Sequence, residues 1–179
     1  MKSFKNLLKC AFIAAQSITL CSCSSDDDEP IYNDPEYIIT SDLTADDVCG
    51  DWILTSVKPS NGEEIIFNLP VSISNPQTAI QSDGTQICTY DVSTAVEDDN
   101  MTIGCSVLNG KVLSVALDYG FTIREDDQPT VSGVIIGNAV GKQNISKNAI
   151  TFTGDCKLTP FGEIPDMNPN PCTYYLQRR

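Results

Sequence analysis

Apolar residues alternate with polar or small residues through most of the chain after Trp52, and this period of two constrains the fold more than any other feature. In a β-strand, successive side chains point to opposite faces, so such alternation marks strands with one buried face. The pattern, bounded by turn residues, predicts eight strands. They are Trp52 to Lys58, Glu64 to Leu69, Gln86 to Thr94, Met101 to Val107, Lys111 to Arg124, Thr130 to Gly137, Ala149 to Thr153 and Thr173 to Arg178.

The segments between these strands are short and rich in turn residues, as in residues 59–62 and 125–129. Only Thr44 suggests a helix start, because its side chain can cap a single turn that carries Asp47 three residues later. Regular short strands without intervening helices indicate one all-β domain over residues 42–179. We expect a single antiparallel, eight-stranded up-and-down barrel, with a β-sandwich as the alternative.

The hairpin formed by the fourth and fifth predicted strands has a register that follows from parity. Both strands bury their odd-numbered positions, and residues that face each other across an antiparallel pair share a face. A three-residue loop, 108–110, satisfies this condition and places Gly110 in a left-handed position. The expected partners are Cys105 with Leu113, Ile103 with Val115, and Met101 with Leu117. The odd-numbered series continues through Gly120, which predicts one long strand with a bend there.

The start of the first strand, Val48-Cys49-Gly50-Asp51-Trp52, resembles the Gly-x-Trp opening of lipocalin-like (calycin-like) barrels. The resemblance implies structural roles for Gly50 and Trp52, with the tryptophan closing one end of the barrel. It also implies that a basic residue of the last strand, here Arg178, lies over the Trp52 ring. The alternative is that Trp52 is a core residue of another β-sandwich. Residues 70–83 depart from the family, since they are polar and predicted to be irregular.

The N-terminal residues 1–22 have the pattern of a secretory signal. Three lysines, Lys2, Lys5 and Lys9, precede an apolar run from Cys10 to Leu20 that is too short for a spanning helix. Residues 23–41 contain a run of acids and few large apolar side chains, which predicts a flexible tether before the barrel.

The boundary between these two segments resembles the lipobox of bacterial lipoproteins. Leu20 is followed by two small residues and Cys23, and four acids from Asp26 to Glu29 follow as in surface lipoproteins of the Bacteroidota. The resemblance implies that Cys23 carries fatty acyl chains such as palmitate, with Cys21 as the alternative site. Each buried methylene contributes about 0.8 kcal/mol, so two or three chains hold a protein on the membrane. We expect a lipid-anchored protein of the cell outer membrane, exposed on the surface.

Composition restricts the chemistry open to this chain. After removal of the signal, eight of the 11 Lys and Arg residues and all 24 Asp and Glu residues remain, giving a formal charge of −16. Such a surface repels nucleic acid. The chain has no histidine, the commonest general base and zinc ligand. The acidic runs lack the spacing of a calcium loop. We therefore expect no metal, no cofactor and no nucleic-acid partner.

Five cysteines lie beyond the signal and Cys23, and an extracytoplasmic location permits disulfides. Cys156 and Cys172 bracket a proline-rich loop, so we predict a disulfide there, with about 3 kcal/mol of stabilisation. We predict a second disulfide between Cys88 and Cys105 on neighbouring strands. Cys49 is then a buried free thiol. A nucleophilic cysteine is the alternative, but it has no histidine partner.

These observations favour binding over catalysis. The first hypothesis is a barrel that binds a small, probably apolar ligand; the predicted lining residues are Tyr90, Ile103, Val115, Tyr119 and Phe121. Bulky inward side chains such as Phe121 also allow a barrel that is filled and binds nothing.

Two alternatives remain open. One is a non-catalytic accessory or structural surface module that contacts glycan or a partner protein of the outer membrane. Its predicted exposed rings are Tyr32, Tyr37, Tyr174 and Tyr175. The other is a hydrolase with a carboxylate pair, although no motif sets two acids in a recognisable arrangement. We expect that the protein is not an enzyme.

Overall fold

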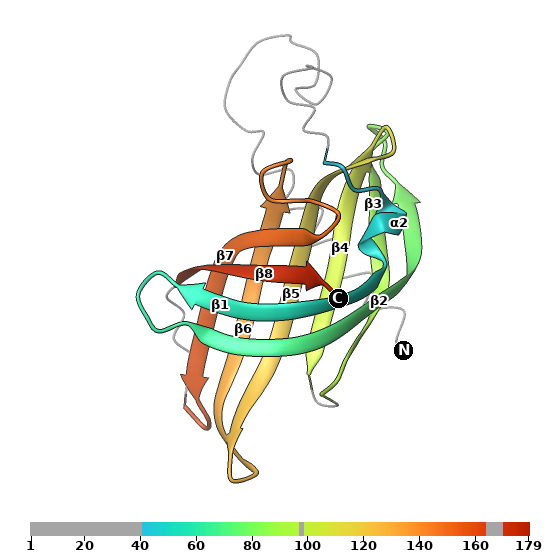
Figure 1. Cartoon of the computed structure of the whole chain (residues 1–179). Coiled ribbons are helices and arrows are strands. Elements are labelled where there is room, and N and C mark those ends of the chain that lie inside the picture. Colours follow the sequence, from blue (N-terminus) through green and yellow to red (C-terminus); the bar gives the residue numbers. More distant parts are fainter. Residues whose placement is uncertain (1–40, 97–98, 164–169) are drawn as a thin grey trace.

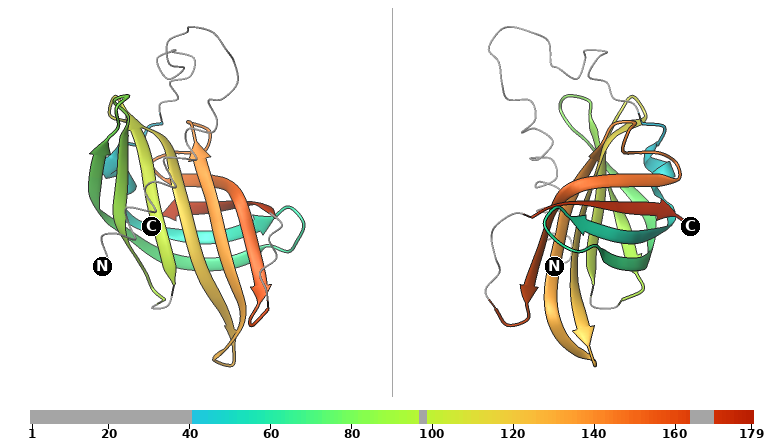
Figure 2. Two further views of the ribbon diagram at one scale, coloured as in Figure 1. Left: turned by 180° about the vertical axis from the view of Figure 1, so that it is seen from behind. Right: turned by 60° about the vertical axis from the view of Figure 1, so that its left-hand side comes forward.

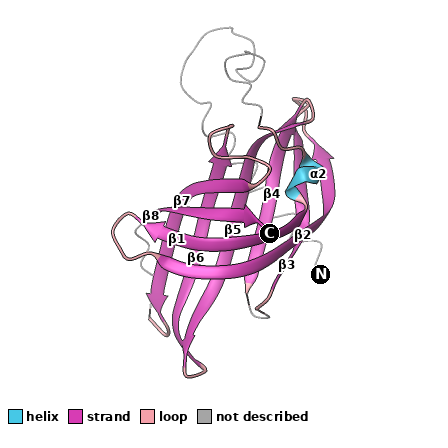
Figure 3. Ribbon diagram, viewed as in Figure 1, coloured by secondary structure: helices cyan, strands magenta, loops and turns pink. Residues whose placement is uncertain are grey.

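A computed structural model describes residues 41–96, 99–163 and 170–179 of the chain. One short helix and eight strands form the fold (Figures 1 and 3). They are α2 (Ala45–Val48), β1 (Gly50–Pro59), β2 (Ile65–Ile80), β3 (Gln86–Thr94), β4 (Asn100–Leu108), β5 (Lys111–Glu125), β6 (Gln128–Val140), β7 (Ala149–Pro160) and β8 (Pro171–Arg178). The predicted signal, tether and lipidation site Cys23 lie outside the described residues.

The eight strands follow one another in sequence order, each antiparallel to the next, and β8 pairs with β1 to complete a closed barrel. This confirms the all-β, up-and-down prediction and distinguishes the fold from the β-sandwich alternative. The β3–β4 pairing is the shortest of the eight and joins only Gln86–Thr89 to Gly104–Val107. No helix in the described part of the chain is long and apolar enough to span a membrane.

The barrel is flattened into two layers whose strands cross at a steep angle. Strands β1, β2 and β8 and the first part of β7 run across one side, and β3 to β6 run along the other (Figures 1 and 2). Strand β7 changes direction along its length and joins the two layers. Gly154 lies within this strand, where a Cβ atom would come within 1.9 Å of the Ile136 carbonyl oxygen. The close approach of β6 and β7 therefore requires glycine at this position.

All eight predicted strands are present, and two of them are much longer than the sequence suggested. Strand β7 continues to Pro160 and β2 continues to Ile80. The prediction that residues 70–83 are irregular is wrong for most of that segment. Val71 and Ile73 are buried on the inner face, and Ser72 between them is exposed. Later residues of β2 are exposed, and their pairing with β3 rather than burial accounts for the strand.

The predicted β4–β5 register is wrong by two residues. Cys105 faces Val115, Ile103 faces Leu117 and Met101 faces Tyr119. A two-residue Asn109-Gly110 turn, with positive φ at both residues, connects the strands. A bulge between Ser106 and Val107 then restores the parity that this turn violates. The prediction that odd-numbered residues face the core is confirmed for Met101 to Val107 and from Val115 onward; Val112 is also buried, on the turn side of the bulge.

The end of the barrel where β1 begins is covered by residues 41–48, and we call it the closed end. Thr44 caps α2 as predicted, since Thr44 and Asp47 form a reciprocal capping box. Leu43 and Val48 are fully buried. The backbone of Val112 exchanges hydrogen bonds with Ser41 and Leu43, which fixes the chain across this end.

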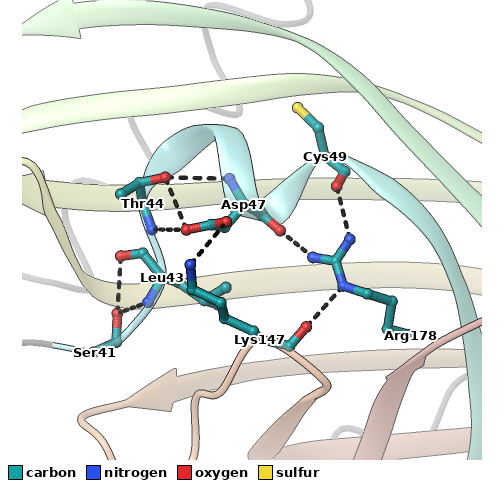
Figure 4. A network of polar contacts seen from close by, with 7 residues as sticks. All are labelled: Ser41, Leu43, Thr44, Asp47, Cys49, Lys147 and Arg178. Atoms are coloured by element: carbon teal, nitrogen blue, oxygen red, sulfur yellow. Dashed lines mark hydrogen bonds and ion pairs between the residues drawn. The ribbon is translucent and has the colours of Figure 1, made fainter.

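Trp52 is fully buried at the closed end, and its indole N–H donates to the Val48 carbonyl at 3.0 Å. The guanidinium of Arg178 lies over the indole ring, as the resemblance implied. It also donates to the backbone carbonyls of Asp47, Cys49 and Lys147 (Figure 4). One side chain thus joins α2, the start of β1 and the β6–β7 loop.

Neither predicted disulfide is present, because all five cysteines of the described residues are free thiols. Cys172 faces Gly154 across the β7–β8 pair, so Cys156 lies two positions away along the strand. Such diagonal neighbours are about 7–8 Å apart, beyond the usual reach of a disulfide. Cys88 and Cys105 do face each other. Each sulfur instead lies within hydrogen-bonding distance of a hydroxyl, Thr78 for Cys88 and Tyr90 for Cys105. Cys49 is partly exposed rather than buried.

Candidate functional site

The middle of the barrel is filled by its own side chains. Tyr119, Phe152 and Tyr174 are among the largest side chains with almost no exposure, and the rings of Phe152 and Tyr174 stack with centroids 4.9 Å apart. Leu117 and Ile135 fill the space on the opposite layer. Side chains in a protein interior are packed about as densely as molecules in an organic crystal, which leaves little room for a ligand. The candidate binding surface is therefore at an end of the barrel rather than in its middle.

The structure does not bring the five predicted lining residues into one site. Val115 and Ile103 are buried core residues, and Tyr90 lies toward the closed end, where its hydroxyl donates to the Ala45 carbonyl at 2.9 Å. Tyr119 and Phe121 lie together nearer the opposite end, with ring centroids 5.3 Å apart. These last two are also buried, and they lie beneath the residues described next.

We call the end opposite α2 the open end; it carries the β1–β2, β3–β4, β5–β6 and β7–β8 connections. The β5–β6 hairpin extends far from α2 at this end (Figure 2). Four apolar side chains face inward here without being fully buried, and we call them the mouth cluster: Ile65, Phe67, Ile123 and Leu158. Leu158 is 39% exposed, and it faces inward because it pairs directly with the buried Gly133.

Phe67 of the mouth cluster packs against two buried aromatic rings beneath it. Phe67 meets Tyr119 and Phe121 edge-on, with centroids 5.8 and 4.8 Å away. Such edge-to-face geometry is the favoured arrangement of aromatic pairs. The Phe121 ring lies over Gly133, where a Cβ atom would be 2.2 Å from the ring. The glycine thus provides the space that the tip of the Phe121 ring occupies.

A carboxylate reaches this aromatic group from the β3–β4 connection. The Tyr119 hydroxyl donates a short hydrogen bond to Asp99. Burial, together with this bond to a carboxylate, raises the pKa of Tyr119 well above its usual value, so the phenol stays protonated. Asp99 is itself only partly buried. A negative charge is therefore held where the packed interior meets the mouth.

Sequence reasoning missed Phe67, Asp99 and Leu158. Phe67 shares its parity with the buried Leu69 and Val71, a signal that would have identified it as inward-facing. Leu158 was missed because its strand was predicted to end at Thr153. No sequence signal separates Asp99 from the other acids of the same run.

Tyr174, predicted to be an exposed glycan-binding ring, is fully buried instead. It lies on the inner face because it pairs directly with Phe152 and Val57, which are both core residues. Among the described residues its hydroxyl has no hydrogen-bond partner, and it lies 2.4 Å from the position that a Gly137 Cβ would take. Tyr175 is 38% exposed on the outer face, whereas Tyr32 and Tyr37 lie outside the described residues.

The buried thiols are protected rather than activated. Burial raises the pKa of Cys105 and of Cys172, each to about 12, and it raises the pKa of Cys49 and Cys156 as well. A thiol with a raised pKa carries little of the reactive thiolate at neutral pH. Within the described ranges, no three acidic or cysteine side chains come together in a way that could hold a metal ion.

Comparison with known proteins gives no match: no protein-family model, no curated protein and no solved structure is significantly similar to this chain. The case for a function therefore depends on the geometry of the barrel and its open end.

Proposed function

We propose that this protein is a binding protein whose barrel takes a small, mainly apolar ligand at its open end. The mouth cluster is the observation that carries the proposal. In a barrel whose middle is filled, apolar side chains that face inward and stay partly exposed offer apolar surface that a ligand can cover. A ligand that covers Ile65, Ile123 and Leu158 removes that apolar area from water, which is favourable at about 25 cal/mol per Å².

Two features support a lipocalin-like barrel in particular. The strands run in up-and-down order around a closed barrel, and the tryptophan of the Gly-x-Trp segment lies at the closed end beneath a basic residue of the last strand. Covering one end leaves the other as the entrance. The packed interior distinguishes this chain from hollow barrels and limits the ligand to the outer part of the lumen.

We propose further that the barrel is displayed on the outer membrane surface as a lipoprotein anchored through acylated Cys23. The support is the order of lysines, apolar run, Leu20 and cysteine, followed by the acidic run from Asp26. Growth with an alkyne-labelled palmitate analogue tests this anchor. Wild-type protein should incorporate the label and partition with membranes, whereas a Cys23→Ala variant should do neither. Labelling that persists in this variant and disappears with Cys21→Ala would move the anchor to Cys21.

Native mass spectrometry of the protein purified from its own cell envelope tests ligand binding. The proposal predicts a small additional mass that is lost when the protein is unfolded. The matched variant Leu158→Asp introduces a charge into the mouth cluster and should arrive without that mass, while Tyr175→Ser on the outer face should keep it. A bare protein mass for wild type would contradict the proposal.

A surface module that contacts a partner protein is the second candidate. It is favoured by Ile80, which is 74% exposed at the end of β2, and by Phe161, which is 60% exposed after β7. Single exposed apolar residues are common on protein surfaces. The mouth cluster is the stronger observation because its members share one inward-facing surface.

A further inference from the structure

We infer that the ligand of the open end carries a positive charge, so that the protein binds a cationic amphiphile such as a long-chain amine. This inference rests on the proposed function and specifies the chemical class of its ligand. Three observations carry it: the apolar mouth cluster, the aromatic rings and carboxylate beneath it, and the unequal distribution of charge between the two ends of the barrel.

Acidic residues surround the open end. Among the described residues, seven carboxylates are found there: Glu63 and Glu64 before β2, Asp99 before β4, residues 125–127 at the β5–β6 turn, and Glu163 after β7. Three cations of the described residues, Lys58, Arg124 and Lys157, lie toward the same end. The field of these charges raises the local concentration of cations and lowers that of anions.

At the closed end, by comparison, acidic and basic side chains are equal in number. Asp42, Asp46, Asp47, Asp51 and Asp83 are matched by Lys111, Lys142, Lys147, Arg178 and Arg179. Several of these cations make specific contacts, as Arg178 does with three carbonyls and Lys147 does with Asp47 at 3.5 Å. The negative field of the chain is therefore directed to the end that carries the mouth cluster.

Contacts inside the mouth match a cation with an apolar tail. Phe67 is the partly exposed ring of the three, packed over the buried Tyr119 and Phe121, and an aromatic ring attracts cations at its face. Asp99 provides a full negative charge next to the Tyr119 ring. The tail can lie on the partly exposed side chains of Ile123 and Leu158. A carboxylate-headed ligand would instead place two negative charges together near an apolar surface, which costs free energy.

Three probes of equal chain length separate charge from apolar binding: decylamine, 1-decanol and decanoate. Isothermal titration would use the chain from Ser24 onward, which retains every described residue, with each probe kept below its micelle concentration. We expect decylamine to bind roughly tenfold more tightly than decanol, and decanoate to bind more weakly than either. The advantage of the amine should shrink as salt is added.

The variant Asp99→Asn removes the internal charge while keeping an acceptor for the Tyr119 hydroxyl. It should bring decylamine affinity close to that of decanol and leave decanol affinity unchanged. The control Asp51→Asn makes the same change in net charge at the closed end. It should alter neither the decylamine affinity nor the decanol affinity. If Asp99→Asn does not fold, the comparison of the three probes on the wild type still decides the question.

Each other outcome contradicts a specific part of the account. Equal binding of the three probes, or tightest binding of decanoate, would overturn the inferred charge and leave the proposed apolar site intact. Failure of all three probes to bind would overturn the proposed function and the inference with it.

Discussion

The guanidinium carbon of Arg178 lies 4.3 Å from the centroid of the Trp52 ring. Trp52 and Arg178 also face each other in the β1–β8 pair that closes the barrel. The contact therefore joins the first and last strands at the closed end and places the cation where it can hold α2 and the β6–β7 loop. We interpret this end as the structural base that leaves the open end available for binding.

Arg178→Ala should lower the free energy of unfolding by about 2–3 kcal/mol, because it removes the cation–π contact and three hydrogen bonds to carbonyls. Arg179→Ala removes a neighbouring exposed charge and should change stability by less than about 0.5 kcal/mol. Urea unfolding measures both. Equal effects of the two variants would show that net charge, not the Trp52 contact, determines the result.

Gly133→Ala should destabilise the barrel by about 1–3 kcal/mol, since its Cβ would lie 2.2 Å from the Phe121 ring. Displacement of that ring should also weaken binding at the mouth. Gly120→Ala is the matched control, because its nearest neighbour is a carbonyl oxygen 3.9 Å away. Thermal unfolding of the two variants compares them, and a fully stable Gly133→Ala protein would contradict the described ring position.

Two tyrosines should respond in opposite ways to loss of the hydroxyl. Tyr119→Phe removes a hydrogen bond to the Asp99 carboxylate and should cost about 1–2 kcal/mol. Tyr174→Phe removes a buried hydroxyl without a partner and should raise stability by up to about 1 kcal/mol. Denaturant titration distinguishes them. A Tyr174→Phe protein as unstable as Tyr119→Phe would mean that the Tyr174 hydroxyl has a partner.

Acid should remove the contribution of Asp47 to stability. Hydrogen bonds from the Thr44 backbone and side chain, with the charge of Lys147, hold the pKa of Asp47 below its usual range. A group with a lowered pKa in the folded state stabilises the protein above its unfolded pKa, and this contribution is lost as the pH falls through the folded value. The advantage of wild type over Asp47→Asn should therefore be present at about pH 6 and decline below about pH 4. Urea unfolding over this range measures it, and a difference that grows toward low pH would contradict the assignment.

Local sequence patterns predicted the elements of this fold better than their pairing. Alternation identified all eight strands, and the capping residue Thr44 identified α2, because both signals act between near neighbours. Parity gave the buried face of β4, but it could not choose between a three-residue loop and a two-residue turn with a bulge. Both solutions keep the same face buried, so burial alone does not determine the register.

The candidate site was harder to predict because it depends on how far each strand extends. The sequence marks Ile123 and Phe121 equally as inward-facing, yet one is partly exposed and the other is buried. That difference follows from strand length and stagger around the barrel, which set which inward residues reach the open end. Asp99 enters the site through contact with Tyr119, twenty residues later in the chain. Pairings over such distances leave no local pattern.

The most direct test of the account is a methyl-resolved NMR titration of the chain from Ser24 onward with 1-decanol, a neutral probe that isolates apolar binding. The account predicts saturable shifts for the methyl groups of Ile65, Ile123 and Leu158 at the open end. The methyl groups of Ile150 and Leu176, close to Trp52 at the closed end, should remain unchanged. Shifts confined to the closed end, or no saturable shift at the open end, would contradict the claim that the mouth of this barrel is a binding site.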